Sequence, residues 1–120
     1  MPYGLKELST LEELDAAMAV SATQPILIYK HSLTCGTSGV AYEEVVDLVE
    51  GSMAPGSAYI VKVQTARNVS DAIEARTSVR HESPQALLVI EGKVVWHASH
   101  FRVTARAIAA ALEKLHAPST

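Results

Sequence analysis

The sequence predicts an α/β fold in which helices flank a mixed four-stranded sheet. Short apolar runs alternate along the chain with segments of helical periodicity, a pattern typical of parallel β-α-β units. The last two apolar runs are separated by only two residues, which indicates an antiparallel hairpin. Because the chain has 120 residues and no repeat or linker, we expect one domain over residues 1–120.

The expected elements follow the order helix, strand, helix, strand, helix, strand, strand, helix. Their approximate ranges are 11–22, 26–30, 39–50, 58–63, from 68 or 70 onward, 86–90, 93–97 and 104–116. Thr10 and Glu13 have the spacing of a capping box, which predicts the start of the first helix. Asn68 or Ser70 would cap the third helix. Gly92 supplies the positive φ that a two-residue hairpin turn requires.

Composition and charge argue against several classes of function. The net charge of −3 provides no basic surface for a nucleic acid backbone. The N-terminus has no basic and apolar signal segment, and no apolar run is long enough to cross a bilayer. We therefore expect a cytoplasmic protein without nucleic acid or membrane partners.

The single cysteine, Cys35, is the residue on which the predicted chemistry depends. One cysteine cannot form an intramolecular disulfide, which leaves a buried thiol, a metal ligand or a reactive thiol. Cys35 lies in the turn between the first predicted strand and the second predicted helix. Unpaired N–H groups and the helix dipole stabilise a thiolate at a helix start, so the position favours a reactive nucleophile.

Polar residues on either side of Cys35 are candidates for supporting roles. Lys30 and His31 end the predicted strand and could direct a cation toward the sulfur, although a lysine at a strand end is more often solvated. Thr37 and Ser38 could hydrogen-bond the thiolate or cap the helix. Gly36 leaves an additional N–H free near the sulfur.

Three segments resemble the signatures of the monothiol bacilliredoxin family, also called YtxJ-like, within the thioredoxin-like fold. They are Lys30–Ser38, Val79–Gln85 and Gly92–His100. The stretches His-Glu-Ser-Pro-Gln and His-Ala-Ser-His are their most specific parts, and the predicted element order is also that of the thioredoxin-like fold. The departure lies at residues 35–38, where the family usually has Cys-Pro-Ile-Ser and this chain has Cys-Gly-Thr-Ser.

The resemblance implies a thiol-disulfide oxidoreductase that removes bacillithiol from protein cysteines. Cys35 would be the nucleophile, bacillithiol the co-substrate, and S-bacillithiolated proteins the partners, with no further cofactor. Dithiol relatives carry a second cysteine where this chain has Ser38, so only a monothiol cycle is possible without an outside thiol.

The resemblance also implies which other residues form the site. Ser83–Pro84 precedes a strand where thioredoxin-like proteins hold a cis-proline, so we predict a cis bond whose neighbouring backbone pairs with an extended ligand. The candidate substrate-binding residues are His81, Ser83, Pro84, Ser99 and His100. The candidate supporting residues are Lys30, His31, Thr34, Gly36, Thr37 and Ser38.

Three alternative interpretations stay open. The Cys-Gly-x-Ser turn is similar to that of monothiol glutaredoxins, which bind glutathione and an iron–sulfur cluster, but Ala98-Ser99-His100 stands where they carry a Gly-Gly pair. A redox-inactive interaction module of the same fold is another possibility. A metal site built from His31, His81, His97 and His100 is disfavoured because their spacing matches no ligand pattern. Trp96 is expected to pack in the core.

Overall fold

The computed structural model describes residues 4–33, 36–51 and 57–116, and the elements below lie within these ranges. The elements in chain order are β1 (Leu5–Glu7), α1 (Leu11–Val20), β2 (Ile26–His31), α2 (Gly36–Glu50), β3 (Ser57–Lys62), α3 (Arg67–Thr77), β4 (Gln85–Ile90), β5 (Lys93–Ser99), the 3₁₀ helix η2 (His100–Arg102) and α4 (Ala105–His116). None of the helices in these ranges is both long enough and apolar enough to span a membrane.

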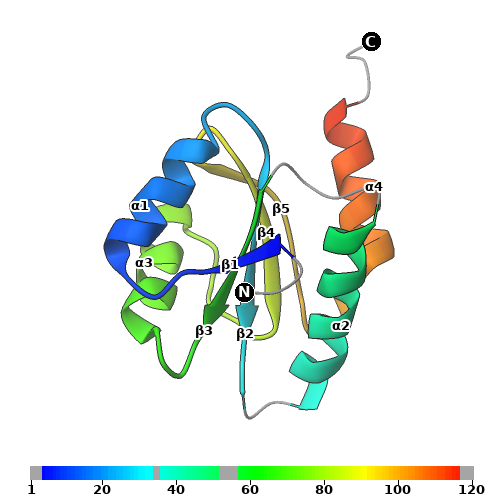
Figure 1. Ribbon diagram of the computed structural model, residues 1–120, viewed down its shortest axis with the longest axis horizontal. Helices are drawn as coiled ribbons and strands as arrows, with labels where there is room; N and C mark the ends of the chain where they lie inside the picture. Colours follow the sequence, from blue (N-terminus) through cyan, green and yellow to red (C-terminus); the bar gives the residue numbers. More distant parts are fainter. Residues whose placement is uncertain (1–3, 34–35, 52–56, 117–120) are drawn as a thin grey trace.

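One mixed sheet separates two layers of helices. The strand order is β1-β3-β2-β4-β5. Strands β1, β3 and β2 pair in parallel, β4 pairs antiparallel with β2, and β5 pairs antiparallel with β4. Helices α1 and α3 cover one face of the sheet, and α2 and α4 cover the other (Figure 1). The predicted α/β class and the mixed sheet are therefore confirmed.

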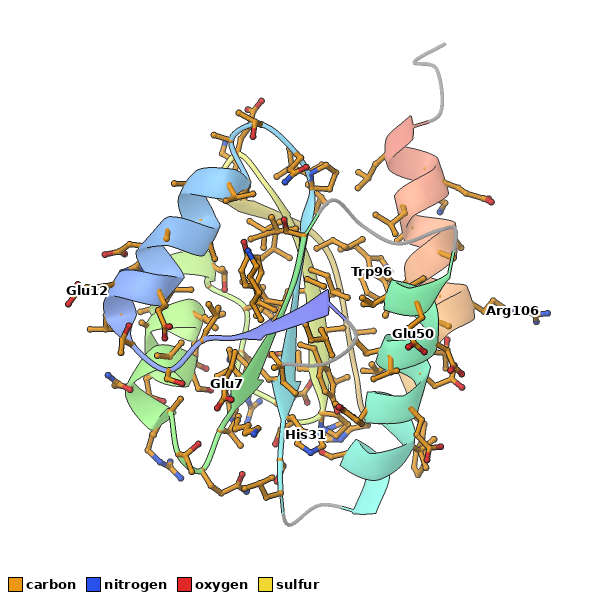
Figure 2. All side chains as sticks on the ribbon, viewed as in Figure 1. Glu7, Glu12, His31, Glu50, Trp96 and Arg106 are labelled. Carbon is orange, nitrogen blue, oxygen red and sulfur yellow. The ribbon has the colours of Figure 1, made fainter. Side chains whose placement is uncertain are left out.

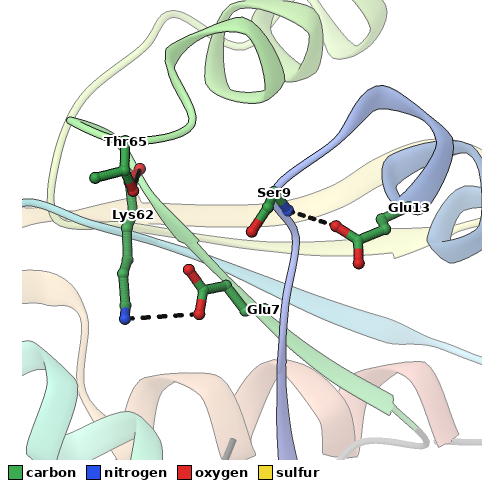
Figure 3. Close-up of polar contacts among 5 residues, drawn as sticks. All are labelled: Glu7, Ser9, Glu13, Lys62 and Thr65. Atoms are coloured by element: carbon green, nitrogen blue, oxygen red, sulfur yellow. Dashed lines mark hydrogen bonds and ion pairs between the residues drawn. The ribbon is translucent and has the colours of Figure 1, made fainter.

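The prediction of four strands is wrong, because β1 adds a fifth at the edge of the sheet. Leu5, Lys6 and Glu7 pair in parallel with β3, and the N–H of Leu8 donates to the carbonyl of Ile60 at 2.9 Å. An ion pair of 3.6 Å joins Glu7 to Lys62 across this edge (Figure 3). Three residues are too few for a period-two pattern to be recognised in the sequence.

Strand β2 is the central strand and is buried on both faces, as the apolar run predicts. It pairs in parallel with β3 and antiparallel with β4. Leu27 and Tyr29 face the core under α2 and α4, while Ile26 and Ile28 face the core under α1 and α3. This alternation fixes on which side of the sheet each following residue of the strand lies.

The helix boundaries follow local capping signals only in part. The capping box is present at α1, with the N–H of Glu13 donating to Thr10 and the Glu13 carboxylate accepting from Thr10. This carboxylate also accepts from the N–H of Ser9 at 2.8 Å (Figure 3). The predicted caps of α3 are wrong, because Ala66 is the N-cap and makes no side-chain hydrogen bond.

The hairpin of β4 and β5 is confirmed. Its two connecting residues, Glu91 and Gly92, both have positive φ, at 51° and 74°, which matches the twist that a two-residue turn needs. Trp96 packs against the core under α2 and α4, as expected (Figure 2).

We expect two glycine substitutions to change stability in opposite directions. Gly39 lies inside α2, and a methyl group added there would meet no other atom within 4 Å, so Gly39→Ala should raise the free energy of unfolding by about 1 kcal/mol. Gly92→Ala should lower it by about 1–2 kcal/mol, because φ at this position is +74°. Urea denaturation of both variants measures the difference, and equal effects would contradict this assignment of the two glycines.

Candidate active site

The candidate site lies where β2 ends and α2 begins. Thr34 and Cys35 lie outside the described residues, and so does the side chain of Thr37. In the sequence, Cys35 directly precedes Gly36, the first residue of α2. The helix therefore starts three residues earlier than predicted. The first turn of a helix carries N–H groups without intrahelical partners, so anionic groups are stabilised there.

The chain that leaves β2 is held by side chains from two other elements. Ser38, fully buried in the first turn of α2, accepts a hydrogen bond from the N–H of Ser32 at 3.2 Å. Gln64, which follows β3, accepts from the N–H of Leu33 at 2.9 Å and donates to the Ser32 hydroxyl at 2.9 Å. These bonds fix the backbone on the N-terminal side of Cys35. The Ser38 hydroxyl thus holds the loop in place, whereas the sequence suggested that it would hydrogen-bond the thiolate or cap the helix.

The sequence interpretation missed Gln64. One signal was available, because the carboxyl ends of parallel strands meet at one edge of a sheet. Residues that follow β2 and β3 therefore come together, and the N–H of Val63 does bond the carbonyl of His31 at 3.0 Å.

A Tyr–His pair lies on the α2 side of β2. The Tyr29 hydroxyl donates to the carbonyl of Ser38 at 3.0 Å and lies 2.9 Å from Nδ1 of His31. Because a tyrosine has one hydroxyl proton, the ring of His31 donates the second of these bonds. The centroid of the His31 ring lies 5.5 Å from that of the Tyr42 ring in α2. His31 therefore lies between β2 and α2 (Figure 2).

The electrostatics of His31 do not support a cationic role. Burial, and to a smaller extent the charge of Lys62, lower the pKa of His31 from its ordinary value of 6.5. The ring is therefore neutral at neutral pH. The structure favours packing and hydrogen bonding of His31 beneath the start of α2 over delivery of a positive charge.

Lys30 is buried, which contradicts the expectation of a solvated lysine at a strand end. Its exposed fraction is 0%, and its Nζ lies 3.2 Å from both the carbonyl oxygen of Ser70 and Nδ1 of His81. Lys30 follows Ile26 and Ile28 on the face covered by α1 and α3, opposite the face of His31. Burial lowers its pKa from 10.5 to about 8, although Glu74 and Asp71 oppose the change.

The predicted cis-proline lies at the same edge of the sheet. The Ser83–Pro84 bond is cis, as predicted, and the carbonyl of Pro84 accepts from the N–H of His100 at 2.8 Å. Gln85 pairs with Lys30 on one side and with Ser99 on the other. The register therefore places His31, Pro84 and His100 next to one another at the ends of three adjacent strands.

A cavity of about 420 Å³ lies beside Ser99 and His100. Its lining includes Glu82, Phe101 and Arg102, and the Phe101 ring is 81% exposed. A hydrogen bond from Ser99 is the main cause that lowers the pKa of Glu82, and His100 Nε2 lies 3.7 Å from this carboxylate. The cavity thus combines an ionised carboxylate, the basic side chains of His97, His100 and Arg102, and one exposed aromatic ring.

The candidate residues fall into two groups on the two faces of the sheet. His31 and Ser38 lie on the α2 side, whereas Lys30 and His81 lie on the α3 side. The 3₁₀ helix η2, which contains His100, packs against α2. Within the described ranges, no three His, Cys, Asp or Glu side chains come together in a way that would hold a metal ion.

A mixed sheet in the order β1-β3-β2-β4-β5, with two helices on each face, defines a protein of the thioredoxin fold, and solved structures agree. A proposed oxidoreductase with a thioredoxin fold matches with a TM-score of 0.81 and 29% identity, covering 90% of this chain and 93% of that chain. A mutant thioredoxin from Halobacterium salinarum matches with a TM-score of 0.76 and 17% identity, and the match covers 99% of this chain and 96% of that chain. Thioredoxin from Trypanosoma brucei brucei matches with a TM-score of 0.75 and 10% identity, and the match covers 95% of this chain and 93% of that chain.

The chain belongs to the monothiol bacilliredoxin family, BrxC, whose sequence profile matches residues 6–108. The resemblance found in the sequence is confirmed. The family and the thioredoxin-fold neighbours together support a thiol oxidoreductase role for this chain.

We expect Ser38→Ala to destabilise the protein by about 1–3 kcal/mol, because it removes the buried acceptor of the Ser32 N–H. Thr23→Ala is the matched control, because the Thr23 hydroxyl makes a solvent-exposed hydrogen bond to the carbonyl of Val20. Its loss should lower the free energy of unfolding by less than about 0.5 kcal/mol. Urea denaturation compares them. Similar values for the two variants would show that Ser38 does not brace the loop.

Proposed function

We propose that this protein removes bacillithiol from protein mixed disulfides, with Cys35 as the attacking nucleophile. The observation that carries the proposal is the meeting of three strand ends, at His31, Pro84 and His100, beside the start of α2. Membership in the monothiol bacilliredoxin family supports the choice of bacillithiol as the small thiol.

The proposed reaction is a thiol–disulfide exchange in which electrons balance without a cofactor. The Cys35 thiolate attacks the bacillithiol sulfur of the mixed disulfide in line with the S–S bond. A new S–S bond joins Cys35 to bacillithiol, and the substrate cysteine leaves as a thiolate that takes a proton from water. A second small thiol, as its thiolate, then attacks the bacillithiol sulfur of this disulfide. A disulfide forms between the two small thiols, and Cys35 leaves as a thiolate, ready for the next cycle.

The described residues support separate parts of this reaction. The N–H groups at the start of α2 favour the thiolate form of a cysteine at its N-terminus. The backbone at Ser83 and Pro84 would pair with the extended segment of the substrate protein. Ser99 and His100, which line the cavity beside β5, would contact the bacillithiol part.

The cycle is proposed to use one protein thiol. Ser38 occupies the position three residues after Cys35, and its hydroxyl is engaged with the N–H of Ser32. A serine cannot resolve a disulfide, so the resetting thiol must come from outside the chain. Bacillithiol acts here as co-substrate, and the proposed partners are S-bacillithiolated proteins of the cytoplasm.

The proposal predicts transfer of a defined mass to Cys35. Reduced protein is mixed with a model protein that carries a bacillithiol mixed disulfide, and intact-protein mass spectrometry follows both chains. We expect the bacillithiol mass to appear on the wild-type chain and to be absent from Cys35→Ser, because the chain has one cysteine.

A glutathione-modified copy of the model protein provides the specificity control. We expect its transfer to be at least about tenfold slower, because contacts made to bacillithiol in the cavity would be lost. If glutathione moves faster than bacillithiol, a glutaredoxin-like function is the better account. If neither thiol moves and Cys35 stays unreactive, the chain is an interaction module of the same fold.

A further inference from the structure

A buried polar cluster on the α3 side of the sheet plays no part in the exchange chemistry proposed above. Lys30 is fully buried, and its Nζ donates to the carbonyl oxygen of Ser70 at 3.2 Å. The same nitrogen lies 3.2 Å from Nδ1 of His81. Burying a cation is unfavourable unless hydrogen bonds compensate it, so these acceptors are needed to keep Lys30 inside the protein.

The contact with Lys30 determines which nitrogen of His81 carries the proton. An ammonium group has three donors and no acceptor, so the Nδ1 atom that faces it must present a lone pair. The Ser70 hydroxyl also lies 3.2 Å from Nδ1 and can donate to the same atom. The proton of the neutral ring therefore resides on Nε2.

His81 in turn anchors the segment that leads to the cis-proline. The N–H of His81 donates to the Glu74 carboxylate at 2.7 Å, and the Gln85 amide donates to the carbonyl of Arg80 at 3.0 Å. With the ring bonded to Lys30, His81 is fixed to both α3 and β2, and the neighbouring Arg80 is fixed to β4. Pro84, only three residues after His81, lies at the sheet edge where the substrate would pair.

We propose that Lys30 is a positioning residue: its buried ammonium locks the His81 ring in the Nε2–H tautomer and thereby holds the Ser83–Pro84 edge in place for the mixed disulfide. The inference rests on the exchange reaction proposed above. It assigns Lys30 a role that acts through His81, in place of the direct electrostatic role considered from the sequence.

The charges around the His81 ring are consistent with this lock. Burial and the charge of Lys30 lower the pKa of His81, with a smaller contribution in the same direction from Arg67 of α3. Glu74 and Asp71, also on α3, act in the opposite direction. Protonation of Nδ1 would place a second cation against the Lys30 ammonium, so the lock opens in acid.

The first test reads the His81 ring directly by nitrogen-15 NMR of the whole chain. In the wild type we expect a protonated Nε2, an unprotonated Nδ1 and a titration midpoint below 6.5. In Lys30→Met the midpoint should rise, because the neighbouring cation that lowers the pKa of His81 is gone. Lys6→Met, at an exposed lysine on the opposite edge of the sheet, should leave His81 unchanged.

The second test measures the second-order rate constant of bacillithiol transfer. Lys30→Met and His81→Leu should each lower it about tenfold, because the docking edge is less well positioned. His81→Asn should retain most of the rate, since the asparagine carbonyl can replace Nδ1 as the acceptor of Lys30. The His81 variants keep the question decidable if Lys30→Met does not fold.

Each outcome decides the inference. A His81 ring protonated on Nδ1, or an unchanged titration in Lys30→Met, would overturn the lock. A normal transfer rate in both Lys30→Met and His81→Leu, or equal losses in His81→Asn and His81→Leu, would overturn the positioning role. If the wild type transfers no thiol, the proposed function is wrong, and so is the role of Lys30 in positioning Ser83–Pro84 for it. The NMR titration still decides separately whether Lys30 fixes the tautomer of His81.

Discussion

The pairing of β2 on both of its edges is the constraint on which the rest of the structure depends. Because β3 and β4 bond to β2 on either side, the strand cannot shift along its axis without breaking both registers. Its end at His31 is thereby set, and so is the point at which the chain turns toward Cys35. Gln64 and Ser38 extend this restraint by two residues, to Leu33.

The alternation of side chains along β2 distributes the polar groups of the site between two layers. Tyr29 and His31 face α2 and hold the first turn of that helix, while Lys30 faces α3 and contacts His81. One short strand therefore organises both the helix that follows the cysteine and the loop that carries Pro84. The two layers meet again at the sheet edge, where Pro84 bonds His100.

Features encoded by neighbouring residues could be predicted from the sequence. The capping box of Thr10 and Glu13, the turn at Gly92 and the strand character of β2 each depend on a few adjacent residues. Lys30 and Gln64 could not be assigned in this way, because their partners lie 51 and 32 residues away in the chain. The edge strand β1 was missed for a related reason, since its three residues become a strand only through pairing with β3.

The most direct test of whether this fold activates its thiol is the rate at which Cys35 reacts with iodoacetamide at neutral pH. The chain has one cysteine, so the loss of free thiol reports Cys35 alone. If the start of α2 stabilises the thiolate, the folded protein reacts faster than the same chain unfolded in urea. A folded protein that reacts more slowly than the unfolded chain would identify Cys35 as a buried, inert thiol and contradict the redox function.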